Sequence, residues 1–149
     1  MAAVSRADAV WEGDLMSGKG RVKVASGTFP EFAVTWADRA DRAHGTSPEE
    51  LIAAAHAGCF TMALSAQLGN AGITPESLET TAAVTLEKLE AGFTITKIHL
   101  DVAARIPGAD KAAFEKAAEN AKAGCPISRL LKAEITMTAR LSGDRAVSA

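Results

Sequence analysis

The sequence predicts an α+β fold in a single domain of residues 1–149. Three observations support this class: several short segments alternate between apolar and polar residues, one long apolar helix lies mid-chain, and strands and helices do not alternate regularly. The predicted order is three strands, a helix, two strands, two helices and a last strand. That order favours largely antiparallel strands over a doubly wound parallel sheet.

Three short segments before the long helix are predicted to be antiparallel strands. They are separated by glycines and by Pro30, which commonly interrupt strands. They cover residues 7–16, 20–25 and 31–36. The residues that follow, 37–46, are polar and are predicted to be irregular; they include Arg39 and Arg42.

A long helix is predicted over residues 47–68. Ser47 is the expected N-cap, Pro48 suits the first helical position, and Glu50 stands three residues after the cap, as in a capping box. Glu49 and Glu50 also suit the positive end of the helix dipole. Beyond this turn the helix is apolar or small on nearly every side, so we expect it to be central and buried.

The C-terminal half is predicted to contain a hairpin, two helices and a final strand. The hairpin turns at residues 90–92, and Gly124 ends the first of the helices. The predicted elements are strands over 79–88 and 92–106, a helix over 110–123, a short helix starting at Cys125–Pro126, and a strand over 133–141. The polar tail from about residue 143 is expected to be disordered.

Alanine dominates the apolar residues of the chain. It supplies 32 of the 71 residues in the hydrophobic class, which leaves 39 with larger apolar side chains. A chain of this length is expected to bury roughly 70% of its unfolded surface. Either the helices pack unusually closely or a second copy of the chain completes the core, and we favour the second explanation.

Charge and hydropathy argue against two classes of partner. The 16 basic and 18 acidic residues give a net charge of −2 without a Lys/Arg block, which argues against nucleic-acid binding. No apolar run is expected to approach the ~20 residues of a membrane span, and the first residues lack the layout of a secretion signal. We therefore expect a cytoplasmic protein whose two cysteines are free thiols or a redox pair.

The two cysteines stand in different predicted environments. Cys59 lies near the middle of the apolar helix, where burial raises the pKa of a thiol and the helix dipole barely reaches it. Taken alone, Cys59 is best interpreted as a small core residue. Cys125 begins a new helix, where backbone N–H groups favour a thiolate. It fits a resolving cysteine and an incidental cap residue equally well.

His56 allows three further interpretations. It precedes Cys59 by three residues, so His56, Cys59 and Cys125 could bind a metal, although neither a CxxC nor an HExxH motif accompanies them. His56 could instead act as a base for Cys59, or be only a hydrogen-bonded core residue. Fingerprints of serine hydrolases, P-loops and dinucleotide-binding sites are absent from the sequence.

Six motifs are spread along nearly the whole chain. They are 45–60 (GTSPEELIAAAHAGCF), 121–128 (AKAGCPIS), 131–135 (LKAEI), 11–15 (WEGDL), 18–20 (GKG) and 92–98 (GFTITKI). Together they resemble the OsmC/Ohr family of osmotically inducible and organic-hydroperoxide-resistance proteins, and the last three match the OsmC branch. The resemblance implies an OsmC-like fold with antiparallel strands and a long buried central helix, in an intertwined homodimer.

The resemblance also implies an antioxidant oxidoreductase, a thiol-dependent peroxidase that reduces organic hydroperoxides. By position, Cys59 matches the peroxidatic cysteine, Cys125 the resolving cysteine and Glu49 the family's glutamate. The implied cycle forms a Cys59 sulfenic acid and then a Cys59–Cys125 disulfide, which an external dithiol reduces without a metal, flavin or nicotinamide cofactor. Apolar residues near Cys59 are expected to favour hydroperoxides with apolar tails; they include Phe60, Met62 and Leu64.

The family's arginine has more than one match in this sequence. Arg39 matches best, although Ala40 stands where an aromatic residue usually follows. Arg42 is therefore an alternative, and Arg21 a more distant one. Ser47 replaces the usual asparagine, which is a conservative exchange at a helix cap. The implied role of the arginine is to lower the pKa of the peroxidatic thiol and to stabilise the departing alkoxide.

Helix geometry separates two of the implied site residues. Glu49 precedes Cys59 by ten residues, which is about 15 Å along a helix axis and too far for a glutamate side chain to span. We therefore expect Glu49 to come from the partner subunit, with the active sites at the interface of a homodimer. This expectation agrees with the small number of bulky apolar residues in one chain.

Two other functions stay open. The chain could be a noncatalytic homodimer of the same fold with a stress-related binding or sensing role. In that case Cys59 would have an ordinary thiol pKa and would form no sulfenic acid. A general disulfide oxidoreductase is the third possibility, which the long gap between the cysteines and the missing CxxC disfavour.

Overall fold

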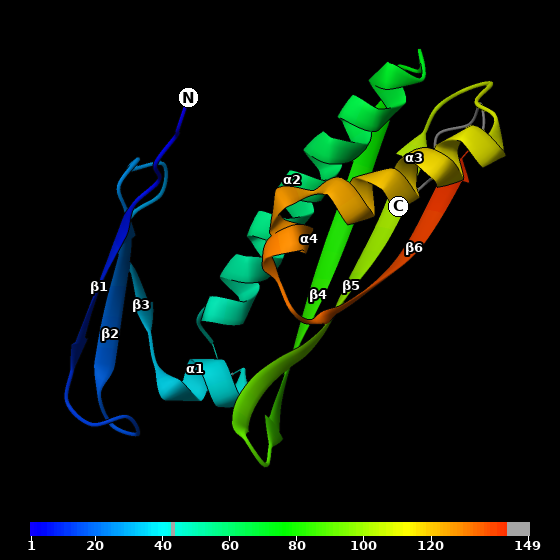
Figure 1. Ribbon diagram of the computed structural model, residues 1–149. Helices are drawn as coiled ribbons and strands as arrows, with labels where there is room; N and C mark the ends of the chain where they lie inside the picture. The colour runs from blue at the N-terminus through cyan, green and yellow to red at the C-terminus, as the bar shows by residue number, and fades with distance from the viewer. Residues whose placement is uncertain (43, 143–149) are drawn as a thin grey trace. The chain divides into compact units, whose positions relative to one another are not determined.

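The computed structural model describes residues 1–42 and 44–142, and it contains two compact units that divide between Leu51 and Ile52. Each unit has a three-stranded sheet (Figure 1). The mixture of strands and helices confirms the predicted α+β class. The single domain over 1–149 stays a prediction, and the predicted disorder of the tail lies outside the described residues.

The first unit contains the three predicted N-terminal strands, joined in the order β1-β2-β3 with antiparallel pairing. They are β1 (Ala7–Glu12), β2 (Lys19–Val24) and β3 (Phe32–Val34). Gly20 lies opposite Trp11 on one side and Val34 on the other. A Cβ atom at Gly20 would lie 2.7 Å from each of those side chains. Only glycine therefore fits this position without displacing them.

A short helix, α1 (Trp36–Asp41), occupies part of the segment 37–46 that was predicted to be irregular. That prediction is wrong because Thr35 caps the helix: its hydroxyl oxygen accepts a hydrogen bond from the Asp38 N–H at 3.1 Å. The Asp38 carboxylate then accepts a bond from the Gly45 N–H at 2.9 Å. These contacts connect α1 to the residues just before the next helix.

The long helix, α2 (Pro48–Asn70), begins where the capping signals predict. The Ser47 hydroxyl accepts a hydrogen bond from the Glu50 N–H at 3.1 Å. The helix is not buried on nearly every side in the single chain. One stripe is fully buried, at four-residue spacing, and it consists of His56, Phe60, Leu64 and Leu68. Met62, by contrast, is 75% exposed, so the apolar sequence of α2 includes a face that one chain leaves uncovered.

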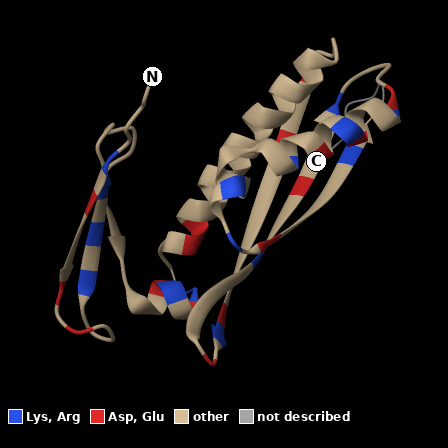
Figure 2. Cartoon of the chain, in the orientation of Figure 1, with Lys and Arg blue, Asp and Glu red and all other residues tan. Residues whose placement is uncertain are grey.

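The length of α2 also corrects the expectation about apolar runs. The helix has 23 residues with a mean hydropathy of 1.4, which is long and apolar enough to cross a membrane by length and composition alone. Glu49 and Glu50 are its only charged residues, and they colour the first turn of α2 red in Figure 2. The core helix of a soluble protein can be equally long and apolar, so length and hydropathy are weak evidence for a membrane span. The fully buried stripe matches a core helix.

The second unit contains a sheet with the order β4-β5-β6. Its strands are β4 (Ser77–Leu89), β5 (Gly92–Arg105) and β6 (Glu134–Ser142). The predicted hairpin is confirmed, and Gly92, with a φ of 115°, closes its turn opposite Leu89. The β5–β6 pair is parallel, which departs from the antiparallel prediction. Parallel neighbours require a crossover, and two helices, α3 (Lys111–Gly124) and α4 (Pro126–Leu130), supply it.

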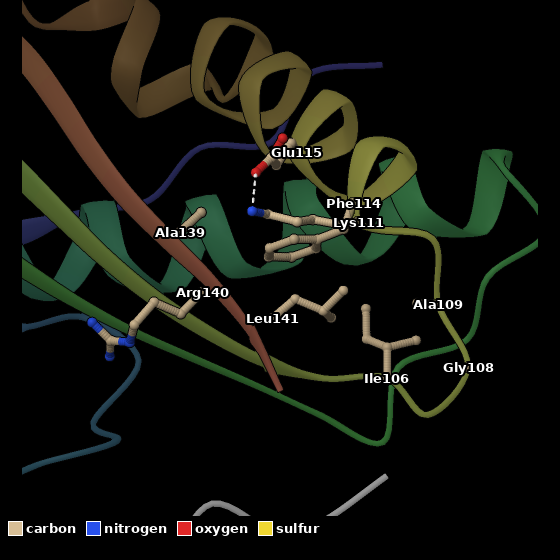
Figure 3. Close-up of a pocket in the computed structure, with 9 residues that line it drawn as sticks. All are labelled: Ile106, Gly108, Ala109, Lys111, Phe114, Glu115, Ala139, Arg140 and Leu141. Carbon is tan, nitrogen blue, oxygen red and sulfur yellow. Dashed lines mark ion pairs between the residues drawn. The ribbon is translucent and has the colours of Figure 1, made fainter. Parts of the chain in front are cut away.

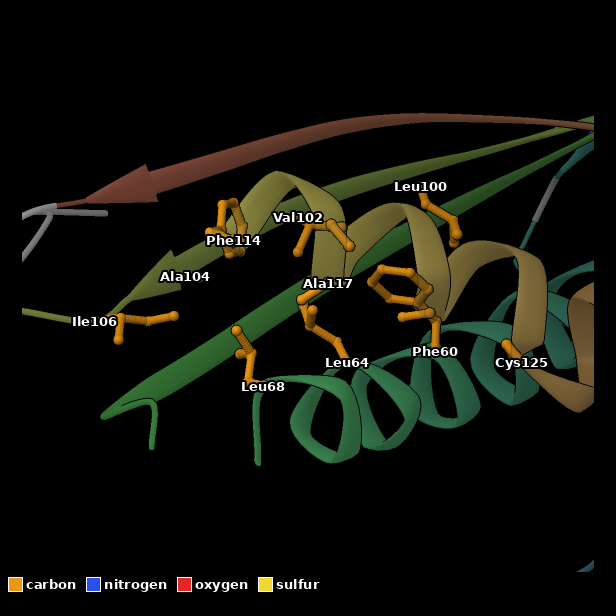
Figure 4. Close-up of a cluster of buried hydrophobic side chains, with 12 residues drawn as sticks. Phe60, Leu64, Leu68, Leu100, Val102, Ala104, Ile106, Phe114, Ala117 and Cys125 are labelled. Carbon is orange, nitrogen blue, oxygen red and sulfur yellow. The ribbon is translucent and has the colours of Figure 1, made fainter. Parts of the chain in front are cut away.

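The hydrophobic core of the second unit lies between α2, β5 and α3 (Figure 4). Alternate residues of β5 face this core, as expected for a strand with one buried face. The core also includes Cys125, which is fully buried at the junction of α3 and α4. The packing of α2 against α3 therefore determines the position of one of the two thiols.

The cap of α2 offers a test of local stability. Replacing Ser47 by alanine removes the acceptor of the Glu50 N–H, and we expect the free energy of unfolding to fall by about 1 kcal/mol. Ser47→Asn keeps a cap acceptor and is expected to change stability far less. Chemical denaturation of the three proteins measures the difference. An equal loss in both variants would contradict the role of the cap.

Candidate active site

The two cysteines lie next to each other in the second unit. The Sγ atoms of Cys59 on α2 and Cys125 before α4 are 3.1 Å apart, and both are free thiols. The Cys125 thiol donates a hydrogen bond to the Cys59 sulfur. A disulfide bond is about 2.05 Å long, so an approach of about 1 Å would bring the two sulfurs to bonding distance.

The surroundings shift the pKa values of the two thiols in opposite directions. Burial raises the pKa of Cys59, and the neighbouring thiol of Cys125 raises it further. Burial also disfavours the thiolate of Cys125, but the backbone N–H of Ser128 and the Cys59 thiol outweigh it, so the pKa of Cys125 is lowered. Within the described chain, these shifts favour a thiolate on Cys125 over one on Cys59.

A bidentate ion pair joins Arg39 and Glu49 in the first unit. The Arg39 Nη2 lies 2.7 Å from the Glu49 Oε1, and the Arg39 Nε donates to Oε1 at 3.1 Å and to Oε2 at 3.3 Å. Glu49 is only 4% exposed, whereas the Arg39 side chain is 37% exposed. The carboxylate therefore fixes the plane of the guanidinium and leaves part of the Arg39 side chain accessible.

The two alternative arginines have other partners. Arg42 donates from Nη1 to the Ser47 hydroxyl, and it is exposed. Arg21 lies 3.5 Å from Glu31. Of the three candidates, Arg39 is thus the one that pairs with Glu49. The structure brings together two pairs of sequence-predicted residues, Arg39 with Glu49 in the first unit and the two cysteines in the second.

His56 is fully buried and bonded to a residue that the sequence interpretation did not single out. Its Nε2 lies 2.7 Å from the Ser128 hydroxyl on α4, which agrees with the interpretation of a hydrogen-bonded core residue. The sequence identifies Ser128 only as part of the motif at 121–128, because nothing in its spacing points to His56. Within residues 1–42 and 44–142, no group of three or more His, Cys, Asp and Glu side chains could hold a metal ion.

The expected apolar surroundings of Cys59 are only partly available to a substrate. Phe60 and Leu64 are fully buried in the core, so they face α3 and β5 rather than solvent. Met62 is exposed. The reason is the helical period: residues at positions 60 and 64 share the buried stripe, and position 62 lies on the opposite face of α2.

The buried histidine is expected to make stability depend on pH. Burial lowers the pKa of His56 below its ordinary value of 6.5. As the pH falls below 6.5, the unfolded chain binds a proton that folded His56 does not, so the free energy of unfolding falls. The slope approaches about 1.4 kcal/mol per pH unit until the pH passes below the folded pKa. The free energy of unfolding is measured by chemical denaturation between pH ~7 and ~5. The same dependence on pH in wild type and His56→Gln would contradict a lowered pKa of His56.

A pocket of about 540 Å³ opens between α3 and the end of β6 (Figure 3). Ile106, Phe114 and Leu141 form the apolar part of its wall, and Arg140 also lines it. Lys111 and Glu115 form an ion pair at its edge, with 3.7 Å between the Nζ and Oε1 atoms. Neither cysteine is among its lining residues, so this pocket does not expose the thiol pair to a substrate.

Comparison with known proteins identifies the family. The family model for OsmC-like protein matches residues 40–140, which include all the candidate site residues except Arg39 and Arg21. The chain belongs to the family of OsmC-like proteins. Peroxiredoxin OsmC of Escherichia coli (strain K12) is 50% identical over 136 residues, which cover 91% of this chain and 95% of that protein.

Two further relatives extend this family assignment to the organic hydroperoxide resistance proteins. One such protein, from Xanthomonas axonopodis pv. citri (strain 306), is 31% identical over 66% of this chain and 68% of its own length. The crystal structure of an organic hydroperoxide resistance protein from Elizabethkingia anophelis has a TM-score of 0.69. It is 26% identical and covers 97% of this chain and 100% of that chain. The described fold is therefore the OsmC-like fold.

Proposed function

We propose that this chain is a cysteine-based peroxidase that reduces organic hydroperoxides to alcohols in antioxidant defence. The observation that carries the proposal is the pair of free thiols at 3.1 Å on two separate elements of one buried core. Its similarity to a peroxiredoxin and to organic hydroperoxide resistance proteins supports a peroxidase role.

The proposed cycle uses the two thiols in sequence. The Cys59 thiolate attacks one oxygen of the hydroperoxide, the O–O bond breaks, and the alkoxide leaves as an alcohol after it takes up a proton. Cys59 is then a sulfenic acid. Cys125 attacks its sulfur, the S–O bond breaks, and water leaves as the disulfide forms. An external dithiol restores both thiols by exchange, so no cofactor is needed.

Arg39 is proposed as the cation that activates Cys59. Burial and Cys125 raise the pKa of Cys59, so its thiol requires a nearby positive charge to become a nucleophile at neutral pH. The Arg39 guanidinium is oriented by Glu49 and stays charged at every relevant pH. Since about 15 Å of helix separate Glu49 from Cys59, we propose that both Arg39 and Glu49 act on the Cys59 of a partner subunit.

The proposed assembly is a homodimer with an active site at each side of its interface. The apolar face of α2 that one chain leaves exposed is the surface that a second copy would cover. The α2 face is also free of charged residues beyond its first turn (Figure 2). A cytoplasmic location fits this chemistry, because the two thiols work only where a dithiol reductant regenerates them.

Oxidation by one equivalent of an organic hydroperoxide tests the cycle. In the wild type we expect a Cys59–Cys125 disulfide, because the resolving thiol is already 3.1 Å away. In Cys125→Ser we expect a stable Cys59 sulfenic acid, which dimedone traps and mass spectrometry of the intact protein detects. Cys125→Ser keeps the volume of the buried side chain nearly unchanged, so Cys59 should still be oxidised.

The noncatalytic alternative makes the opposite prediction for the same experiment. A binding or sensing protein would show Cys59 titrating near its ordinary pKa of about 8.5 and would yield neither adduct nor disulfide. That result in the folded wild-type dimer would refute the peroxidase proposal. A disulfide that forms with diamide but not with hydroperoxide would instead favour a general disulfide oxidoreductase.

A further inference from the structure

His56 is a buried titratable residue that the proposed cycle leaves without a role. It is fully buried on α2, one turn before Cys59, and its Nε2 lies 2.7 Å from the Ser128 hydroxyl. Its second ring nitrogen, Nδ1, is buried and has no hydrogen-bond partner among the described residues. Burial lowers the pKa of His56, so the ring is neutral at pH 7 and carries one proton.

The unpartnered nitrogen indicates which nitrogen carries that proton. A buried N–H group without an acceptor is rarer in proteins than a buried acceptor without a donor. We therefore assign the proton to Nε2, with Nδ1 as the unprotonated nitrogen. The Nε2–H group then donates to the Ser128 oxygen. This direction matters because it leaves the hydrogen of the Ser128 hydroxyl available for another acceptor.

The acceptor that we assign to that hydroxyl is the sulfur of Cys125, the N-cap residue of α4. Ser128 follows Cys125 by three residues, and both its backbone N–H and its hydroxyl favour the thiolate of Cys125. Cys125 is fully buried and Ser128 is 8% exposed, so water has little access to the sulfur. The charged residues on the flanking turns are engaged or exposed: Lys122 pairs with Glu119, and Arg129 is exposed.

We propose that the Ser128 hydroxyl, oriented by His56, donates a hydrogen bond to the sulfur of Cys125 as the disulfide forms, which makes Ser128 a catalytic residue of that step. His56 is then a positioning residue that acts through Ser128. The chain of donors runs from the His56 Nε2–H to the Ser128 oxygen and from the Ser128 O–H to the sulfur. Such bonds are often long in a resting enzyme and shorten as charge develops.

The step that this contact serves rests on the proposed function. The Cys125 thiolate attacks the sulfur of the Cys59 sulfenic acid, an S–S bond forms and the S–O bond breaks. The departing hydroxide takes up the proton that Cys125 released and leaves as water. The Cys125 sulfur is oxidised and the Cys59 sulfur reduced to the disulfide level, so no further oxidant is required.

Titration of Cys125 tests the contact without any peroxide. In a Cys59→Ser background, ultraviolet absorbance of the thiolate reports Cys125 alone, and the chain has no tyrosine to interfere. We compare Ser128→Thr, which keeps the hydroxyl, with Ser128→Val, which has the same shape without it. Ser128→Val is expected to raise the titration midpoint of Cys125 by about one pH unit, which leaves about tenfold less thiolate at neutral pH. Ser128→Thr is expected to leave the midpoint nearly unchanged.

His56 is tested in the same background by a second matched pair. His56→Gln keeps an N–H donor that can reach Ser128, and His56→Leu removes it. The Leu variant is expected to raise the Cys125 midpoint and the Gln variant to preserve it. A purely structural role would lower the melting temperature in both variants and leave both midpoints at the wild-type value. Equal midpoints for Thr and Val at position 128, or for Gln and Leu at position 56, would overturn the inference.

Two measurements separate this inference from the proposed function. In a chain with both cysteines, Ser128→Val is expected to slow disulfide formation about threefold relative to Ser128→Thr, because about tenfold less thiolate is partly offset by the higher nucleophilicity of a thiolate with a higher pKa. Nitrogen NMR of wild-type His56 is expected to show the proton on Nε2, and a proton on Nδ1 would overturn the inference. If the wild type forms no sulfenic acid, the proposed function fails, and the titration still decides whether Ser128 acts on Cys125.

Discussion

Replacing Cys59 by serine is expected to abolish the consumption of organic hydroperoxide, with a loss of more than about a thousandfold in kcat/KM. A serine hydroxyl remains protonated at neutral pH and cannot accept an oxygen atom from a peroxide as a sulfur does. The assay follows hydroperoxide loss in the presence of an excess dithiol. The wild type and Cys59→Ser are compared at equal concentrations of folded protein.

The control for this experiment is Cys125→Ser. It lacks the resolving thiol but keeps Cys59, so it should consume one equivalent of hydroperoxide rapidly and then depend on direct reduction of the sulfenic acid by the dithiol. Unchanged turnover in Cys59→Ser would show that Cys59 is not the peroxidatic residue. Because both substitutions exchange sulfur for oxygen in the same core, a difference between them reports chemistry rather than packing.

Arg39 is expected to be more important for turnover than Arg42. Arg39→Lys keeps the charge but loses the bidentate contact with Glu49, and we expect kcat/KM to fall by about 10²–10³. Arg42→Lys is the matched control, since Arg42 contacts the Ser47 hydroxyl instead of Glu49. Steady-state kinetics with a saturating dithiol measure both. A larger loss in Arg42→Lys would reverse the assignment.

Mixing of subunits extends this prediction to the assembly. If Arg39 acts on the Cys59 of a partner subunit, then Cys59→Ser and Arg39→Lys each supply what the other lacks. A mixture of the two inactive proteins, denatured together and refolded, should regain about a quarter of the wild-type activity, because half of the dimers are mixed and each has one intact site. No regain of activity would place both residues of a site in the same subunit.

The sequence was sufficient to predict most of the fold, but not the direction of every strand. Alternation of apolar residues identified β4, β5 and β6, yet the same alternation is compatible with either orientation of a neighbouring strand. The parallel pairing of β5 and β6 depends on the crossover through α3 and α4. The α1 helix was missed because it has only six residues, and its stability depends on the contacts of Thr35 and Asp38.

The candidate site was predictable only in part for a similar reason. The resemblance to the OsmC/Ohr family named Cys59 and Cys125, but their spacing in the chain carries no information about a 3.1 Å contact. The Ser128–His56 bond joins residues that are 72 positions apart and follows from the packing of α4 against α2. The helical pattern of α2 likewise could not indicate how much of its surface a single chain covers.

The position of Cys125 in the crossover has a consequence for the oxidised protein. A disulfide to Cys59 would close a loop of 66 residues that contains β4, β5 and α3. Closing a loop of that size lowers the conformational entropy of the unfolded chain by the equivalent of about 4 kcal/mol. By thermodynamic linkage, folding favours the closed loop by the same amount. The oxidised protein would then melt at a higher temperature than the reduced protein, and its reductant would have to open a bond that the native fold itself stabilises.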